Sequence, residues 1–129
     1  MIADIRRMLE HYGFTGEDLT RARLDFRVQL LEEETHEVRE AVGNGDAPEV
    51  VDGLIDVIVI ALGTLELAGV DVDCAWRRVM SANMQKQRGQ KPGRASDGWD
   101  LTKPPGWRAP DHGDNVGRLP NIFKGKQNG

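Results

Sequence analysis

The sequence predicts an all-α fold, and three features support that prediction. Apolar residues recur at helical spacing before residue 90, glycine or proline interrupts the pattern between segments, and no stretch alternates apolar and polar residues as a strand would. We therefore expect four helices in residues 1–90, followed by an irregular basic tail, rich in Pro and Gly, in residues 91–129. Only one of these helices is strongly apolar, so the core of one chain is thin. We expect a partner's helices to complete it, in a homodimer or a homotetramer.

Glycines mark the ends of the first two predicted helices. An amphipathic segment from Ile2 to Tyr12 stops at Gly13, and Thr15 with Asp18 resembles a capping box for the next helix. The second helix is expected from about residue 24 to residue 42 and ends at a Gly-Asn-Gly sequence. One apolar stripe runs along it, formed by Leu24, Val28, Leu31, Val38 and Val42.

The third predicted helix begins with a strong start signal. Asp46 supplies an N-cap, Pro48 suits the first turn, and Glu49 occupies the capping-box position. Its apolar pattern continues to about Ala68 and is closed by Gly69.

The fourth predicted helix has two alternative caps, Asp71 and Asp73. It is expected to continue through about Arg88. Its inner side would carry Trp76, Val79 and Met80.

Charge is distributed unevenly along the chain. The net charge is −4. Residues 1–83 hold 8 Lys and Arg against 17 Asp and Glu, whereas residues 84–129 hold 9 against 4. An acidic body is unsuited to general binding of a phosphate backbone, so we do not expect nucleic acid as the main partner. A basic tail that folds over an acidic, cation-loaded cleft suits a small polyphosphate.

Cysteine content and hydropathy favour a cytoplasmic protein. Cys74 is the only cysteine, which excludes an intramolecular disulfide and fits a reducing compartment. The segment Met1 to Arg7 lacks the apolar region of a signal peptide, and the longest apolar stretch, Val57 to Leu62, is far too short to cross a membrane. We expect no membrane association.

Acidic residues concentrate on the second and third predicted helices. Two antiparallel helices joined by a short loop can present Glu34 and Glu37 from one and Asp52 and Asp56 from the other to a common point. Asp56 lies in an apolar run, where an ionised carboxylate needs compensation. A cation, a basic side chain such as Arg27 or Arg78, or protonation of Asp56 would each provide it.

Hard oxygen ligands in this number suit Mg²⁺, with Mn²⁺ as an alternative. Such an ion keeps some waters and takes further oxygens from a substrate phosphate. His36 is positioned about 100° from Glu37 around the helix axis, so we interpret it as a surface or partner-facing residue rather than a ligand.

The order of these motifs resembles the MazG-like nucleoside triphosphate pyrophosphohydrolases. Their all-α superfamily also contains dimeric dUTPases, dCTP pyrophosphatases and phosphoribosyl-ATP pyrophosphohydrolases. Its members carry EExxE on one helix and (E/D)xx(x)D on the next, and Glu33-Glu34-Thr35-His36-Glu37 matches the first motif. For the second motif, Glu49 to Asp52 fits literally, but Asp56 is favoured by the residues downstream of it. In that register Gly53 stands where many relatives have glutamate, so Asp52 would replace that ligand.

Two further segments extend the resemblance, which covers roughly residues 24–110. The sequence from Ser81 to Lys86 is similar to the family's Asn and Lys region for nucleotide phosphate, and Asp100 to Trp107 is similar to a tail found in some members.

The resemblance implies a four-helix MazG-like bundle and Mg²⁺-dependent hydrolysis of a (deoxy)nucleoside triphosphate between its α and β phosphates, giving the monophosphate and pyrophosphate. It also implies roles for the candidate residues. The metal ligands would be Glu34, Glu37, Asp52 and Asp56, and the catalytic base or additional ligand would be Glu33 or Glu34. Asn83, Lys86 and Lys103 would bind phosphate, and one of Trp76, Trp99 and Trp107 would stack on the base, with nothing in the spacing to select among them.

Two other classes of function stay open from the sequence. The chain could be a non-catalytic helical dimerisation module whose acids keep its surface soluble, or a nucleic-acid-associated protein that uses the basic tail. No GxxxxGK[ST] loop occurs, which argues against a P-loop NTPase.

Overall fold

The structure is a computed structural model that describes residues 1–127, and the chain divides into two compact units. Unit 1 comprises Met1–Asp71 together with the C-terminal segment that begins at Val116; unit 2 comprises Val72–Asn115. The all-α prediction is confirmed, because the only strands among the described residues are two of three residues each. The predicted domain boundary near residue 90 stays a prediction.

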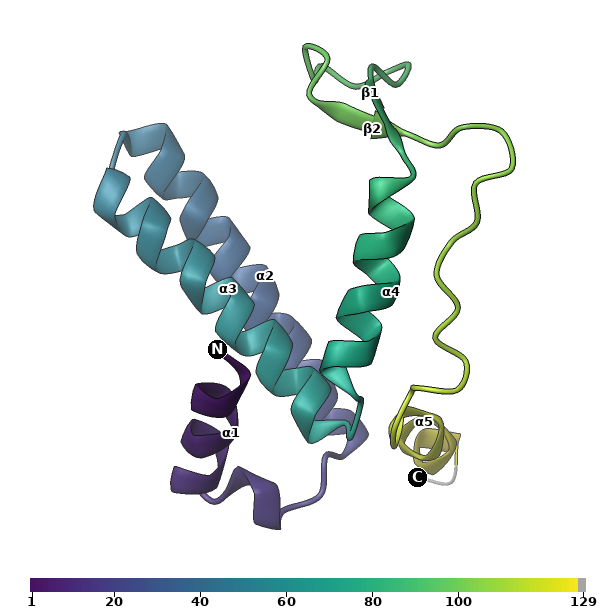
Figure 1. The fold of residues 1–129 in the computed structure, drawn as a ribbon. Helices are drawn as coiled ribbons and strands as arrows, with labels where there is room; N and C mark the ends of the chain where they lie inside the picture. Colours follow the sequence, from purple (N-terminus) through teal and green to yellow (C-terminus); the bar gives the residue numbers. More distant parts are fainter. Residues whose placement is uncertain (128–129) are drawn as a thin grey trace. The chain divides into compact units, whose positions relative to one another are not determined.

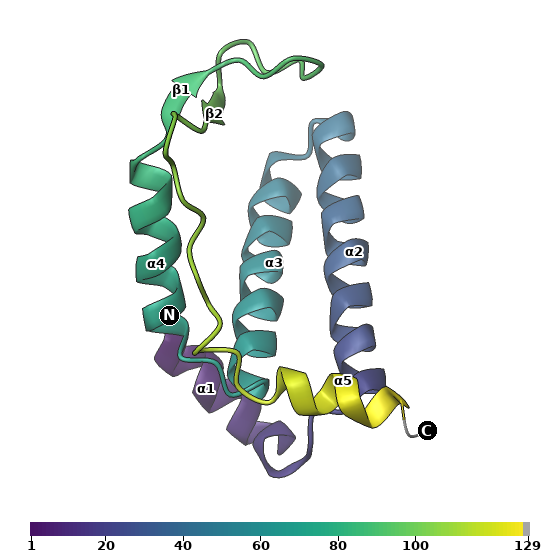
Figure 2. The ribbon, with the colours of Figure 1, turned by 90° about the vertical axis from the view of Figure 1, so that its right-hand side faces the viewer.

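Unit 1 is built around an antiparallel pair of long helices. It contains α1 (Ile2–His11), the single 3₁₀ turn η1 (Phe14–Gly16), α2 (Arg21–Asn44), α3 (Ala47–Leu67) and α5 (Leu119–Gln127). Helices α2 and α3 lie side by side in both views (Figures 1 and 2) and make the most extensive contact between any two elements. This hairpin carries all the acidic residues expected to bind a metal.

Local side-chain bonds explain where these helices begin. The hydroxyl of Thr20 accepts a hydrogen bond from the Arg23 backbone N–H at 3.2 Å, so α2 begins at Arg21. The predicted cap at Thr15 was wrong, because that residue lies in η1. The prediction for α3 is confirmed: Asp46 accepts from the Glu49 N–H at 3.3 Å, and proline occupies the first turn.

Helix α1 packs against α3. Leu9 is 1% exposed and Ile5 is 6% exposed, and the Arg6 guanidinium binds the Glu66 carboxylate in a fork at 2.9 and 3.1 Å. Apolar burial and a bidentate ion pair therefore hold the N-terminal helix in place.

The C-terminal segment returns to unit 1, although the sequence predicts an irregular tail over residues 91–129. Arg118 donates from its backbone N–H to Ala68 O at 2.7 Å and from its guanidinium to Leu67 O at 3.0 Å. It thereby satisfies carbonyls at the end of α3. Gly117 has φ +55°, and a Cβ there would lie 2.1 Å from Ala68 O, so only glycine fits. Ile122 of α5 is buried, and α5 contacts α2 (Figure 2).

Unit 2 contains α4 (Val72–Met84) and a short hairpin. Helix α4 ends before the predicted limit of Arg88, because β1 (Gln87–Gly89) pairs antiparallel with β2 (Asp100–Thr102). The side-chain amide of Gln90 organises the connecting loop: it donates to Arg94 O and accepts from the Gly98 N–H at 2.8 Å. Neither strand is long enough to show an alternating pattern, which explains why the sequence predicted none.

No helix within residues 1–127 is both long enough and apolar enough to cross a membrane.

Candidate functional site

Helices α2 and α3 approach each other closely at two glycines of α3, and these contacts define which sides of the helices face one another. A Cβ added at Gly53 would lie 2.7 Å from Val38 Cγ2, and one added at Gly63 would lie 2.6 Å from the Arg27 guanidinium. Arg27 is held there by bonds to Thr64 Oγ1 at 3.0 Å and to Ile60 O at 3.1 Å, and its burial lowers the pKa of the guanidinium. These glycines let the two helices approach closely at both ends of one stretch.

Glu34 and Asp56 lie within that stretch. Glu34 is seven residues after Arg27 and four before Val38, so all three share the α3-facing side of α2. Asp56 is three residues after Gly53 and seven before Gly63, which places it on the side of α3 that faces α2. In an antiparallel pair with this register, position 34 lies opposite position 56 or 57. Both acids are half-buried.

The other three predicted ligands all contribute to the electrostatic environment of Glu34. Partial burial raises the pKa of Glu34, and the neighbouring Glu37, Asp56 and Asp52 carboxylates raise it further. Glu34 is therefore the acid whose ionised form the site disfavours. These charges connect two acids of α2 with two acids of α3, and their role as metal ligands stays a prediction.

The four carboxylates do not form a closed cage. Glu37 and Asp52 are exposed, and within the described residues no three acidic, His or Cys side chains are already arranged to hold a metal ion. Mutual repulsion favours such a spread arrangement. The donor chemistry nevertheless suits a hard divalent cation, because carboxylate oxygens are the ligands that Mg²⁺ prefers.

The expectation that apolar side chains enclose Asp56 was wrong for a single chain. Ile55 is 54% exposed and Ile58 is 42% exposed, so the apolar run is only partly covered. An apolar run covers the whole circumference of a helix, but α2 shields only one side of α3.

Neither suggested arginine compensates Asp56 in an ion pair. Arg27 bonds instead to Thr64 and to the carbonyl of Ile60. Arg78 pairs with Asp114 at 2.6 Å and 3.1 Å.

Glu33 and His36 both point to local partners on α2. Glu33 is exposed and accepts a long hydrogen bond from the Gln29 amide at 3.4 Å. His36 lies 3.0 Å from a Glu40 carboxylate oxygen and is exposed. The interpretation of His36 as a surface residue is therefore confirmed, while the role of Glu33 stays a prediction.

The predicted phosphate-binding residues gather in unit 2. Trp107 donates its Nε1–H to Ala82 O at 2.8 Å, and the Lys86 and Lys103 ammonium groups lie 5.1 and 5.0 Å from the centre of its ring. The backbone carbonyl of Asn83 accepts a hydrogen bond from the Lys86 backbone N–H at 3.1 Å. The indole thus positions two cations that are 17 residues apart in sequence. Because lysines contact the ring, less of its face is open to a nucleobase.

Sequence reasoning missed two features of this site. Arg27 was considered only as a partner for Asp56, although its seven-residue spacing from Glu34 was a signal that both face α3. Gly53 was interpreted as a missing ligand position, but Val38 fills the space that any side chain there would need.

Comparison with known proteins identifies a family. Residues 7–83 match the family model described as PRA-PH, phosphoribosyl-ATP pyrophosphohydrolase. No curated protein matches the chain. The family match spans α2, α3 and all four acids as well as Asn83, but ends before Lys86, Lys103 and Trp107. It indicates a pyrophosphohydrolase and confirms the resemblance drawn from the motifs. The chain belongs to the phosphoribosyl-ATP pyrophosphohydrolase family, and through it to the MazG-like all-α NTP pyrophosphatase superfamily.

Proposed function

We propose that this protein hydrolyses a nucleoside triphosphate or a closely related nucleotide between its α and β phosphates, releasing pyrophosphate and the monophosphate. The observation that carries the proposal is the coupling of Glu34 to Glu37, Asp52 and Asp56 across α2 and α3. A carboxylate whose ionisation three neighbouring acids oppose makes a poor structural contact, but it suits a site that binds cations.

We propose that Glu34, Glu37, Asp52 and Asp56 hold Mg²⁺, with Mn²⁺ as an alternative. When bound, the ion neutralises polyphosphate charge and lowers the pKa of a bound water. The donor set supports this assignment, because a cation would relieve the repulsion that raises the pKa of Glu34.

The chain's own groups supply proton transfer and orientation. Glu33 or Glu34 accepts the proton of the attacking water. In unit 2, Asn83, Lys86 and Lys103 bind phosphate oxygens, and Trp107 holds the two lysines in position.

Two substrate classes are supported by different observations. The motifs favour a (deoxy)nucleoside triphosphate, whereas the name of the matching family favours phosphoribosyl-ATP. Both contain the same triphosphate group, so the acidic site serves either one equally. Groups that contact the base and the sugar decide between them.

The test is a panel of (deoxy)nucleoside triphosphates and phosphoribosyl-ATP, each incubated with the full-length protein and Mg²⁺. Products are resolved as pyrophosphate or phosphate by ³¹P NMR. We expect pyrophosphate and the monophosphate from at least one substrate, and no turnover in EDTA. Release of phosphate alone would contradict the proposed cleavage position.

Glu32→Gln is a matched control for the acidic site. Glu32 is exposed on the same helix, about 200° around the axis from Glu34, so its change should leave turnover intact. If no nucleotide is hydrolysed by the folded wild-type protein, the dimerisation module is favoured instead. Salt-dependent binding of DNA or RNA without hydrolysis would favour a nucleic-acid-associated protein.

A further inference from the structure

Unit 2 contains a groove that the proposed active site does not use. Its volume is about 340 Å³, and three arginines contribute to its walls. One wall belongs to α4 and the other to the segment after Trp107. The lining residues are Arg77, Arg78, Ser81, Ala82, Gln85, Arg108 and Pro110, with no acidic side chain among them.

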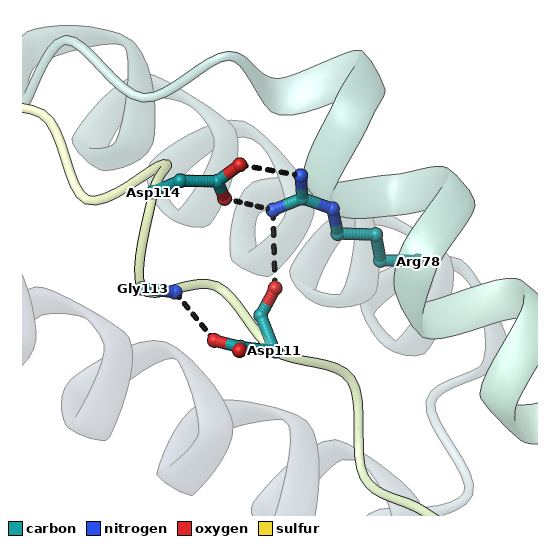
Figure 3. Close-up of polar contacts among 4 residues, drawn as sticks. All are labelled: Arg78, Asp111, Gly113 and Asp114. Carbon is teal, nitrogen blue, oxygen red and sulfur yellow. Dashed lines mark hydrogen bonds and ion pairs between the residues drawn. The ribbon is translucent and has the colours of Figure 1, made fainter.

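Two anchors hold the second wall against α4. On one side of Arg108, the Trp107 indole donates to Ala82 O at 2.8 Å. On the other side, the Arg78 guanidinium donates to Asp111 O at 3.1 Å and binds the Asp114 carboxylate at 2.6 and 3.1 Å (Figure 3). The Gly113 N–H in turn donates to the Asp111 carboxylate at 2.8 Å. The backbone on both sides of Arg108 is thus held against α4.

The groove keeps positive charge despite these contacts. Asp114 offsets the charge of Arg78, and the contacts within the described residues occupy three of the five N–H groups of that guanidinium. Arg77 and Arg108 are exposed at the groove and add two further cations. Guanidinium groups in this number are suited to phosphoryl oxygens, which they bind in pairs.

The groove lies on a different side of α4 from Asn83, the proposed phosphate-binding residue of that helix. Arg77 and Ser81 are spaced four apart and share one side of the helix. Asn83 is two residues from Ser81, about 200° around the axis. A ligand in the groove is therefore not the phosphate chain that Asn83 contacts.

We propose that this groove, which we call the arginine groove, is a second binding site for a small phosphate-bearing anion such as pyrophosphate or the polyphosphate group of a free nucleotide. Its size supports a small ligand, because it is a local concavity rather than the extended basic track that a nucleic-acid strand requires. The inference does not depend on the metal site of unit 1.

The test is calorimetric titration of inorganic pyrophosphate into the full-length protein in EDTA. We expect saturable binding that Arg77→Ala with Arg108→Ala weakens at least tenfold. Both side chains are exposed, and neither belongs to the two anchors, so circular dichroism should be unchanged. Arg7→Ala with Lys91→Ala is the matched control: it removes two cations outside the groove, and binding should persist.

Three outcomes would overturn the inference. These are no binding of pyrophosphate at millimolar concentration, equal losses in the groove variant and the charge-matched control, and tighter binding of a single-stranded oligonucleotide that the groove variant abolishes. Glu37→Gln should leave pyrophosphate binding in EDTA unchanged. Failure of the proposed hydrolysis would therefore be distinguishable from failure of the second site.

Discussion

At the residue scale, Glu34 is the side chain whose ionisation is most strongly tied to its neighbours. Its pKa is raised by partial burial and by the charges of Glu37, Asp56 and Asp52. A raised carboxyl pKa means that Glu34 contributes stability to the folded state at low pH. That contribution is lost as the pH rises from the ordinary range of glutamate through the raised pKa.

A pH series on the metal-free protein tests the predicted direction of this pH dependence of stability. We expect Glu34→Gln to be more stable than wild type near neutral pH, because Gln cannot ionise. The difference should shrink as the pH falls below the raised pKa. The measurement is urea unfolding in EDTA at several pH values, with Glu32→Gln as the exposed control on the same helix. A difference that grows towards low pH would contradict the assignment.

Two further substitutions test the metal site. Glu37→Gln and Asp56→Asn should each abolish Mg²⁺-dependent turnover while the helical content stays near that of wild type. Asp56→Asn should also raise the thermal midpoint in EDTA, because it removes one of the repelling charges. The measurements are pyrophosphate release and circular dichroism. Unfolding of Asp56→Asn would mean that the carboxylate has a structural partner.

At the element scale, the contact between α2 and α3 depends on a small residue at position 53. Gly53→Ala would place a methyl group against the stiff side chain of Val38, so we expect a loss of about 1–3 kcal/mol in the free energy of unfolding. Gly43→Ala is the matched control: it is also helical, nothing lies within 4 Å of its Cβ, and helix propensity predicts a small gain.

Denaturant unfolding of both variants checks this prediction. Adding Val38→Ala to Gly53→Ala should recover part of the loss, because the smaller side chain makes room for the new methyl group. If Gly53→Ala is as stable as wild type, the helices are not in close contact at this point.

Helix boundaries show where sequence reasoning succeeds and fails. The start of α3 was predictable, because Asp46, Pro48 and Glu49 all act within one turn. The start of α2 was misplaced: Thr15 and Thr20 are both plausible caps, and only the formation of η1 decides between them. The end of α4 depends on a strand partner 13 residues away, which local propensity cannot reveal.

At the scale of the whole molecule, α3 presents an apolar stripe away from α2. Its exposed residues are Val51 (65%), Leu54 (50%), Ile55 (54%) and Ile58 (42%). Such a contiguous apolar surface favours association. We therefore expect a homo-oligomer, and Leu54→Glu with Ile58→Glu should shift it towards monomer. Sedimentation velocity at micromolar concentration is the measurement, and a stable wild-type monomer would contradict the prediction.

Point substitutions test the contribution of residues 91–129 to turnover better than truncation does. Removal of everything after Gln90 would delete α5 and the Arg118 contacts with α3, so the helical core would no longer be intact. Lys103→Ala with Trp107→Ala is the sharper change. We expect at least a tenfold loss in kcat/KM, roughly 1.4 kcal/mol, with unchanged Mg²⁺ binding. Lys91→Ala is the control. Unchanged kinetics would remove Lys103 and Trp107 from the proposed site.

The sequence by itself determined the all-α class and the pairing of two long helices. Helical periodicity and capping act within a few residues, so local sequence patterns reveal them. A short loop makes α2 and α3 neighbours, which is the basis for expecting Asp52 and Asp56 to meet Glu34 and Glu37; that these four acids form one metal site stays a prediction.

Only the tertiary structure decided the features that join distant parts of the chain. Val38 fills the space at Gly53, Arg118 caps α3 from 51 residues away, and Trp107 assembles Lys86 with Lys103. It also decided that Arg77, Arg78 and Arg108 line one groove. Each of these contacts depends on the path of the backbone through several turns. Many weak contacts together set the geometry of those turns, so no local sequence pattern predicts it.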